Sequence, residues 1–162
     1  MKVYTFLTDS HRIFLDSYIR TFPFEDNFDL EIKFLPQECH TGKYHSDGWN
    51  KTMRRKVEYI LYSLQNCDDN SLFVHSDVDV QFFGPIKTDL ENLMEEKNHD
   101  ILFQNDGHQM SMGFFVCKKN DKTIRLFKDV LQNLDNHRDD QFATNFFLKK
   151  SDLIYGPLPE RY

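Results

Sequence analysis

The sequence contains little that would support a disulfide-stapled, zinc-binding or membrane-spanning protein. Only three of its 162 residues are cysteine, namely Cys39, Cys67 and Cys117, and no two of them form a Cys-x-x-Cys pair. An odd and widely spaced set of this kind predicts neither a disulfide framework nor a zinc site. No apolar run approaches the roughly 20 residues that a membrane span needs, and the apolar stretch after Met1 is too short for a signal peptide. We therefore expect a cytoplasmic protein.

Positive charge is also scarce. The chain has 20 Lys and Arg residues against 26 Asp and Glu, which gives a net charge of −6. Such an acidic chain is poorly suited to a phosphate backbone, so we expect no nucleic-acid partner. Hydrophobic residues make up 40% of the chain and include 16 Phe, which is typical of a folded domain. The length fits one domain, residues 1–162, and leaves the oligomeric state open.

Strand and helix patterns alternate along the chain. Strands are predicted at residues 3–7, 30–35, 71–79, 100–103, 114–117 and 154–155, and helices at 13–22, 47–65 and 90–96 and after 121 and 139. The residues that we expect to cap helices are Ser46 or Asp47, Asp121, and one of Asp139 and Asp140. Strands that alternate with helices indicate an α/β fold, in which helices flank a mostly parallel central sheet.

Two carboxylates, those of Asp77 and Asp79, follow the most apolar predicted strand. Residues i and i+2 of an extended chain project to the same side, and open α/β sheets bind ligands at the carboxyl ends of their strands. Two close carboxylates repel each other unless a cation lies between them, and oxygen ligands suit Mg²⁺ or Mn²⁺. We therefore predict a metal site, with a solvated turn as the alternative, because Asp is common in turns.

A lysine and a histidine lie near this acidic pair. Lys56 falls almost two turns after Trp49 on a predicted helix, on the inward face that also carries Met53 and Ile60. A cation on an inward face needs a partner, such as a diphosphate or a carboxylate. The alternative is that its long stem reaches out to solvent. His75 lies within the strand before the acidic pair, and we expect it to pack there rather than to bind a metal.

Two further polar segments are candidates for the site. At Asp139-Asp140-Gln141 one Asp can cap a helix while the other enters the site, although capping alone would explain Asp at this position. Between residues 104 and 112 polar groups precede Gly113, whose missing side chain would let a sugar approach closely. An ordinary glycine-containing loop is the alternative. The sequence has no Gly-x-Gly-x-x-Gly or Walker loop.

Together these segments resemble the nucleotide-diphospho-sugar transferases of the GT-A fold, including glycogenin-like enzymes and small viral and bacterial relatives. The similar blocks, in matching order and approximate spacing, are Asp77-Val78-Asp79, Gly84-Pro85, Met112-Gly113-Phe114-Phe115-Val116 and Asp140-Gln141 with Asn145. The resemblance implies a single Rossmann-like GT-A domain. It also implies transfer of a sugar from a nucleotide-diphosphate donor, by default a UDP-sugar, to an acceptor hydroxyl.

The resemblance also implies roles for single residues. Asp77 and Asp79 would hold Mn²⁺ or Mg²⁺ against the diphosphate, and Asp140, with Asp139 second, would be the catalytic carboxylate at the reaction centre. The residues implied to bind the nucleotide sugar are Thr8, Lys56, Asp77, Val78, Asn105, Asp106, Gly113 and Gln141. Many members take a further metal ligand, often His, from a later C-terminal segment, and this sequence ends before one. Neither the stereochemical course nor the sugar and acceptor follow from the sequence.

Two other functions stay open at this point. Haloacid-dehalogenase-type phosphohydrolases also carry Asp-x-Asp after a strand, but usually after the first one, whereas two predicted strands precede Asp77 here. The other alternative is a truncated or non-catalytic nucleotide-sugar-binding module, which the lack of the later segment suggests. Turnover of a donor sugar would separate these hypotheses from a working transferase.

Overall fold

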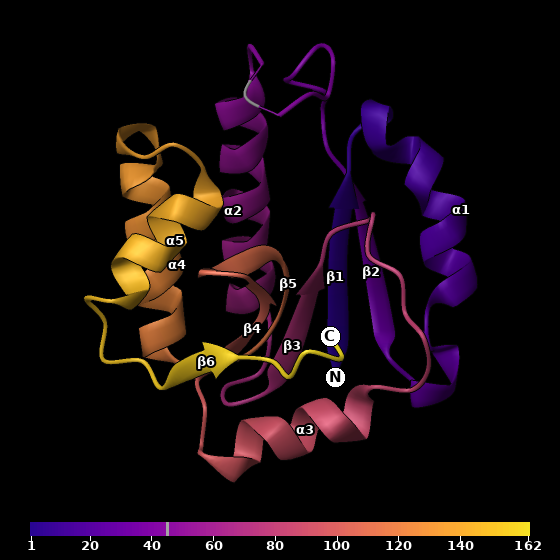
Figure 1. The fold of residues 1–162 in the computed structure, drawn as a ribbon, viewed down its shortest axis with the longest axis vertical. Coiled ribbons are helices and arrows are strands. Elements are labelled where there is room, and N and C mark those ends of the chain that lie inside the picture. Colours follow the sequence, from indigo (N-terminus) through magenta and orange to yellow (C-terminus); the bar gives the residue numbers. More distant parts are fainter. Residues whose placement is uncertain (45) are drawn as a thin grey trace.

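A six-stranded sheet forms the centre of the molecule (Figure 1). The computed structural model describes residues 1–44 and 46–162. In spatial order the strands are β2 (Asp29–Phe34), β1 (Lys2–Leu7), β3 (Leu72–Ser76), β5 (Gln109–Lys118), β4 (Ile101–Asp106) and β6 (Tyr155–Pro157). Each predicted strand is therefore present.

The sheet is mostly parallel, as predicted. β1 pairs in parallel with β2 and β3, and β4 pairs in parallel with β6. β5 is the exception, because it runs antiparallel to both β3 and β4. It begins at Gln109, before the predicted residue 114, because it forms a hairpin with β4 in which Gln109 pairs with Asp106.

Helices cover both faces of the sheet (Figure 1). They are α1 (Arg12–Thr21), α2 (Trp49–Gln65), α3 (Lys87–Glu96), α4 (Asp121–Asn133) and α5 (Asp140–Leu148), with short 3-10 turns at Asp9–His11, Phe24–Asp26 and Leu134–Asn136. Side chains of α2, α4 and α5 share one hydrophobic core with the sheet, and those of α1 and α3 share another. None of the helices in the described part of the chain combines the length and apolar character that crossing a membrane requires.

The two cores follow from the alternation of side chains along each strand. In β1, Tyr4 and Phe6 belong to the core under α2, whereas Val3 and Leu7 belong to the core under α1. A sheet covered on both faces needs apolar residues at successive positions, and full burial of one such side chain contributes about 1.5–3 kcal/mol. This requirement explains the almost continuous apolar runs by which the strands were predicted.

Two helix caps differ from the prediction. Asn120, not Asp121, caps α4, because its side chain accepts a hydrogen bond from the backbone N–H of Thr123 at 2.9 Å. Its own N–H donates to the Thr123 hydroxyl at 3.1 Å, and Asp121 has no hydroxyl three residues later with which to make this reciprocal pair. Gly48 is the N-cap of α2 where Ser46 or Asp47 was expected, and a glycine has no side chain with which to cap the helix.

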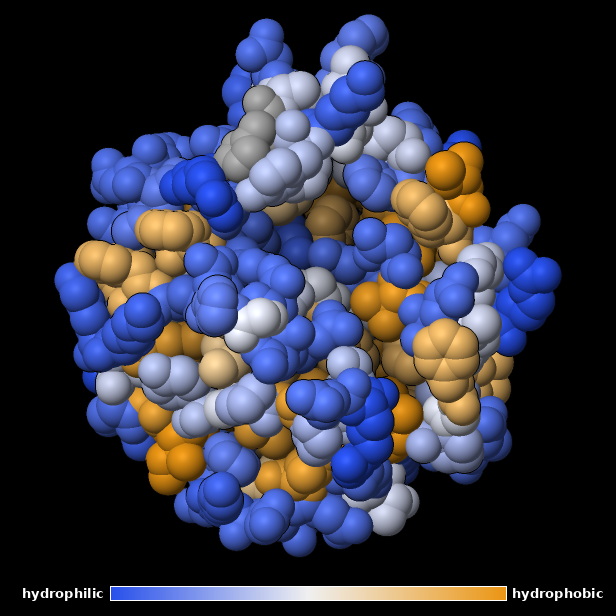
Figure 2. Space-filling view, in the orientation of Figure 1, coloured by the Kyte–Doolittle hydropathy of each residue, from blue (hydrophilic) through white to orange (hydrophobic). Residues whose placement is uncertain are grey.

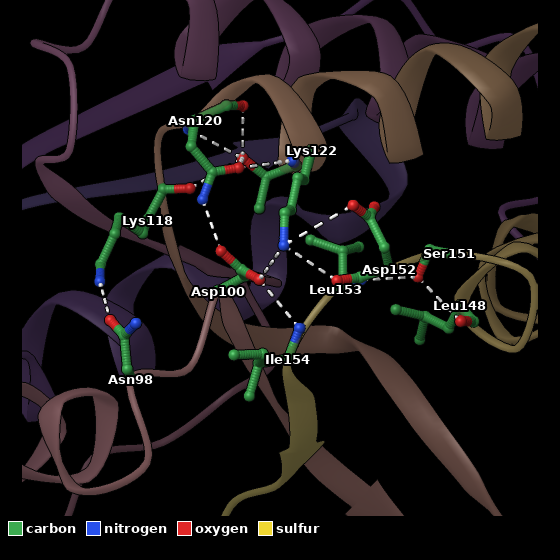
Figure 3. A network of polar contacts seen from close by, with 11 residues as sticks. Asn98, Asp100, Lys118, Asn120, Lys122, Leu148, Ser151, Asp152, Leu153 and Ile154 are labelled. Carbon is green, nitrogen blue, oxygen red and sulfur yellow. Dashed lines mark hydrogen bonds and ion pairs between the residues drawn. The ribbon is translucent and has the colours of Figure 1, made fainter.

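A buried carboxylate fastens the β6 edge of the sheet (Figure 3). Asp100, which precedes β4, accepts hydrogen bonds from the Asn120 amide at 2.6 Å and from the Ile154 backbone N–H at 2.8 Å. The Nζ of Lys122 lies 3.8 Å from the same carboxylate. Asp100 therefore joins the start of β4, the start of α4 and the segment that enters β6.

We expect Asp100→Ala to lower the free energy of unfolding by about 2–4 kcal/mol, because it leaves two donors without their acceptor in a buried place. Urea unfolding measures this loss. Asp152→Ala is the matched control, since Asp152 also lies near Lys122, at 3.7 Å, but its side chain is 68% exposed. We expect that control to cost less than about 1 kcal/mol. Equal losses in the two variants would show that the carboxylate of Asp100 is not a fastening point.

Candidate functional site

A cavity of about 850 Å³ opens at the edge of the sheet where β1 and β3 end. Its size is that of a small-molecule site, and it lies where α/β sheets bind their ligands. α2, the turn after β3, the β4–β5 hairpin, the start of α5 and the last two residues form its wall. Figure 2 shows this face of the molecule hollowed near its centre, with hydrophilic and hydrophobic residues around the hollow.

Asp77 and Asp79 both line this cavity, but they lie in a turn and not in the extended strand that we predicted. β3 ends at Ser76, and the backbone N–H of Val80 donates to the carbonyl of Asp77 at 3.2 Å. The backbone N–H of Asp77 is still held by the carbonyl of Gly113 at 2.7 Å. As a result the side chain of Asp77 is only 29% exposed, whereas Asp79 is exposed.

Lys56 joins two carboxylates at the floor of the cavity. Its side chain is 4% exposed, and its Nζ lies 2.8 Å from Asp77 Oδ2 and 3.5 Å from Asp140 Oδ2. The predicted inward position is confirmed, and the alternative of a stem that reaches solvent is wrong. Burial alone would lower the pKa of the Lys56 ammonium, but the charges of Asp77 and Asp140 raise it above its ordinary value. Lys56 is therefore a buried cation that its two partners keep charged.

His75 supports Asp77 from the opposite side. It is fully buried, stacks on Phe6 and packs against Phe115, as expected for a residue within the strand. Its Nε2 also lies 3.1 Å from Asp77 Oδ1. Burial lowers the pKa of the His75 imidazole, so the neutral ring donates from Nε2 to the carboxylate. Burial would raise the pKa of Asp77, but Lys56 and His75 together lower it.

Asp139 and Asp140 divide the two roles that the sequence left open between them. Asp139 caps α5, because its Oδ1 accepts from the Phe142 N–H at 2.7 Å while its Oδ2 accepts from the Tyr44 hydroxyl at 2.8 Å. Asp140 is buried in the cavity wall beside Lys56. Burial raises the pKa of Asp140. At Asp139 burial also acts to raise the pKa, but hydrogen-bond donors outweigh it, the Phe142 N–H first, and the pKa of Asp139 is lowered.

Amide side chains of α5 fasten it to the β4–β5 hairpin. Gln141 donates to Asp106 Oδ2 at 2.9 Å, and its own carbonyl accepts from the Met112 N–H at 3.3 Å. Asn145 exchanges two hydrogen bonds of 2.9 Å with the backbone of Met110. These contacts fix the position of α5, and with it Asp140, relative to the sheet.

Other residues of the predicted site divide between cavity wall and outer surface. Gly113 lines the cavity, and a Cβ at this position would lie 3.5 Å from Asp77 Oδ2. Thr8 and Val78 line a smaller cavity of about 110 Å³, which shares the Asp77 wall. Asn105 is exposed and lies outside both walls, because Gln104 on one side of it faces the cavity instead.

Aromatic residues at the two ends of the cavity were not predicted. At one end lie Tyr44 and Trp49, whose rings meet edge to face at 5.2 Å. At the other end lie Phe83, which is 95% exposed, and Tyr162, whose hydroxyl donates to Asp89 at 2.6 Å. Trp49 was predicted on the inward face of its helix but not as a site residue. No sequence pattern marks the other three, since they come from loops and from the chain end.

Tyr44 belongs to the strap, the segment of residues 36–44 and 46–48 that joins β2 to α2. Gly48 fixes the end of the strap, because its φ is 84° and a Cβ there would overlap the carbonyl oxygen of Glu38. The strap reaches α5 through the hydrogen bond of Tyr44 to Asp139. Gly48 thus lets the start of α2 lie directly against the backbone of Glu38.

We expect Gly48→Ala to destabilise the protein more than Gly107→Ala. Both glycines have positive φ, at 84° and 63°, where a non-glycine residue costs about 1–2 kcal/mol. Only Gly48 has a backbone atom in the way, whereas the space around a Cβ at Gly107 is open. Urea unfolding compares the two variants, and equal losses would show that the strap moves aside without cost.

The carboxylates of Asp77 and Asp79 suit a divalent cation that a phosphate ligand also binds. Mg²⁺ is commonly held by one or two carboxylates together with substrate phosphates and water. Both oxygens of Asp77 already accept from protein donors, and within residues 1–44 and 46–162 no three His, Cys, Asp or Glu side chains are grouped around a metal position. The pair therefore fits a site completed by substrate and does not fit a self-contained metal cage.

Comparison with known proteins shows the fold. No protein-family model matches the chain, and no curated protein matches it by sequence. The apo-form glycosyltransferase GlyE of Streptococcus pneumoniae TIGR4 is similar with a TM-score of 0.63 at 14% identity, over 99% of this chain and 45% of that one. The galactosyltransferase LgtC, solved in complex with donor and acceptor sugar analogs, has a TM-score of 0.63 at 10% identity, over 100% of this chain and 74% of that one.

A glycosyltransferase involved in the glycosylation of the major capsid of PBCV-1 is also similar, with a TM-score of 0.62 at 10% identity, over 97% of this chain and 81% of that one. The chain spans less than half the length of GlyE. The predicted GT-A fold is thus confirmed. A shared fold does not by itself show that this chain catalyses the same reactions.

Proposed function

We propose that this protein is a metal-dependent glycosyltransferase, which moves a sugar from a nucleotide-diphosphate donor to an acceptor hydroxyl. The observation that carries the proposal is the triad of Lys56, Asp77 and Asp140, in which Lys56 and Asp140 are buried. It lies at the carboxyl edge of a GT-A sheet beside the exposed carboxylate of Asp79. A solvated Asp-x-Asp turn would not explain why a buried, charged lysine, Lys56, lies between Asp77 and Asp140.

Asp77 and Asp79 would hold Mn²⁺ or Mg²⁺ at the cavity edge. When bound, the metal neutralises charge that develops on the departing diphosphate. Lys56 supplies a second positive charge at the same place, which would stabilise that developing charge as well. Thr8 and Val78, which line the adjoining small cavity, would lie beside the nucleoside, and uridine diphosphate is the default donor nucleotide.

Asp140 would act on the sugar or on the acceptor. In an inverting reaction it takes the proton of the acceptor hydroxyl as general base. In a retaining reaction its carboxylate orients or stabilises the oxocarbenium-like sugar. We assign neither task to Asp139, because its carboxylate caps α5 and accepts from the Tyr44 hydroxyl, whereas Asp140 lies beside Lys56.

Calorimetric titration with uridine diphosphate tests the proposal, first with Mn²⁺ and then with chelator. We expect binding that needs the metal and that Asp77→Asn/Asp79→Asn abolishes. The control variant is Asp68→Asn/Asp69→Asn, which removes the same charge from an exposed turn. Hydrolysis of a UDP-sugar panel without acceptor is the next measurement. If no nucleoside diphosphate binds the folded protein, or if generic phosphate esters are hydrolysed instead, the proposal is wrong.

A further inference from the structure

Lys56 occupies the space between the two carboxylates that the proposed reaction needs. Its Nζ donates to Asp77 Oδ2 at 2.8 Å and lies 3.5 Å from Asp140 Oδ2. The other oxygen of Asp77 is held by His75 at 3.1 Å. A metal ion that binds either oxygen of Asp77 would therefore compete with one of these donors.

The two donors of Asp77 differ in how easily they can move. His75 is fully buried and lies between the rings of Phe6 and Phe115, so its ring has no space to turn away. Lys56 has a flexible four-carbon stem with a compact charge at its end, and its partners line an open cavity of about 850 Å³. The bond from Lys56 to Oδ2 is accordingly the one that can be exchanged.

Gly113 leaves the cavity side of that oxygen uncovered. It carries no side chain, and a Cβ there would lie 3.5 Å from Asp77 Oδ2 and 3.3 Å from the Ser111 hydroxyl. An incoming ligand can thus reach the oxygen that Lys56 now occupies.

We infer that Lys56 is a displaceable internal cation, which weakens metal binding in the free protein and moves to the diphosphate when the donor enters. A metal ion and an ammonium at one carboxylate oxygen repel each other. A diphosphate removes this repulsion, because its oxygens bind both cations at once. Metal and diphosphate then strengthen each other's binding, and this coupling is reciprocal. The inference rests on the proposed function, since it requires a diphosphate ligand.

The decisive variant is Lys56→Met, with Lys51→Met as the matched control. Lys51 lies on the same helix but is exposed, so its loss removes the same charge without touching the triad. Calorimetry measures Mn²⁺ alone and inorganic pyrophosphate alone with each protein. We expect Lys56→Met to bind Mn²⁺ alone roughly tenfold more tightly than wild type and pyrophosphate roughly tenfold more weakly, with both affinities unchanged in Lys51→Met.

Opposite signs are the signature of the inference, because a lysine that only supports the fold would weaken both ligands when lost. Lys56→Met leaves two acids without their cation and could misfold for that reason. The second variant, Lys56→Met/Asp140→Asn, removes one of these acids as well, and its comparator is Asp140→Asn alone. We expect the double variant to bind Mn²⁺ alone more tightly than that comparator. If wild type binds Mn²⁺ and UDP together, but neither Lys56→Met nor Lys56→Met/Asp140→Asn gains affinity for Mn²⁺ alone, the inference fails and the proposed function stands. If wild type binds no diphosphate under any condition, both fail.

Discussion

Asp77→Asn is expected to reduce both the stability of the protein and the turnover of a UDP-sugar donor. The change leaves the buried ammonium of Lys56 with Asp140 alone, and breaking a buried pair costs about 3–5 kcal/mol. Because the Asp77 side chain is 29% exposed and solvent screens the pair, we expect a loss just below that range, about 2–3 kcal/mol. The loss of a metal ligand removes several kcal/mol of charge stabilisation, which corresponds to a fall of roughly 10²- to 10³-fold in kcat/KM.

Asp79→Asn separates the two effects. Asp79 lines the same cavity but is exposed, so its neutralisation should leave the free energy of unfolding within about 0.5 kcal/mol of wild type. Turnover should nevertheless fall as it does for Asp77→Asn. Urea unfolding and donor hydrolysis, measured on both variants, check the contrast. Full turnover in Asp79→Asn would remove it from the metal site, and an unchanged stability in Asp77→Asn would show that the triad is not a structural unit.

The fold was predictable because the sheet is covered on both faces. That arrangement demands apolar residues at successive strand positions, and it makes the runs around Val3, Val74 and Val116 recognisable. The antiparallel direction of β5 was not predictable, since direction depends on the hairpin at Gly107 and not on the apolar pattern. Caps were predicted by residue type alone, and the reciprocal bond between Asn120 and Thr123 decided against Asp121.

The candidate site was predictable only where residue type carries the signal. An inward lysine and paired carboxylates are costly when unpartnered, so Lys56, Asp77 and Asp140 were recognisable as residues that need partners. Which of them would meet depended on how α2, β3 and α5 converge, and that is a property of the folded chain. Tyr44 and Phe83 have no such cost, because aromatic residues on loops are unremarkable until a cavity is formed between them.

Asp140→Asn is expected to abolish most turnover without destabilising the protein. General acid–base catalysis contributes typically 10²- to 10⁴-fold, so we expect a fall of about that size in kcat. Burial raises the pKa of Asp140, which means that folding disfavours its ionised form at neutral pH. A neutral amide of the same shape removes that cost, while Lys56 keeps its contact with Asp77. The midpoint of thermal unfolding should therefore stay equal or rise.

The neighbouring variant Asp139→Asn should behave in the opposite way. The pKa of Asp139 is lowered in the folded protein by the donors that its carboxylate accepts, so its ionised form stabilises the fold above the ordinary pKa of Asp. Asn caps a helix about as well as Asp, so the cost should come from the weakened hydrogen bond with the Tyr44 hydroxyl and amount to about 0.5–1.5 kcal/mol, with a smaller loss of turnover than in Asp140→Asn. Thermal unfolding and donor hydrolysis of the two variants check the pair. Because the two acids are adjacent and the substitution is the same, a reversed result, with Asp139→Asn inactive and Asp140→Asn active, would transfer the catalytic role to the helix cap.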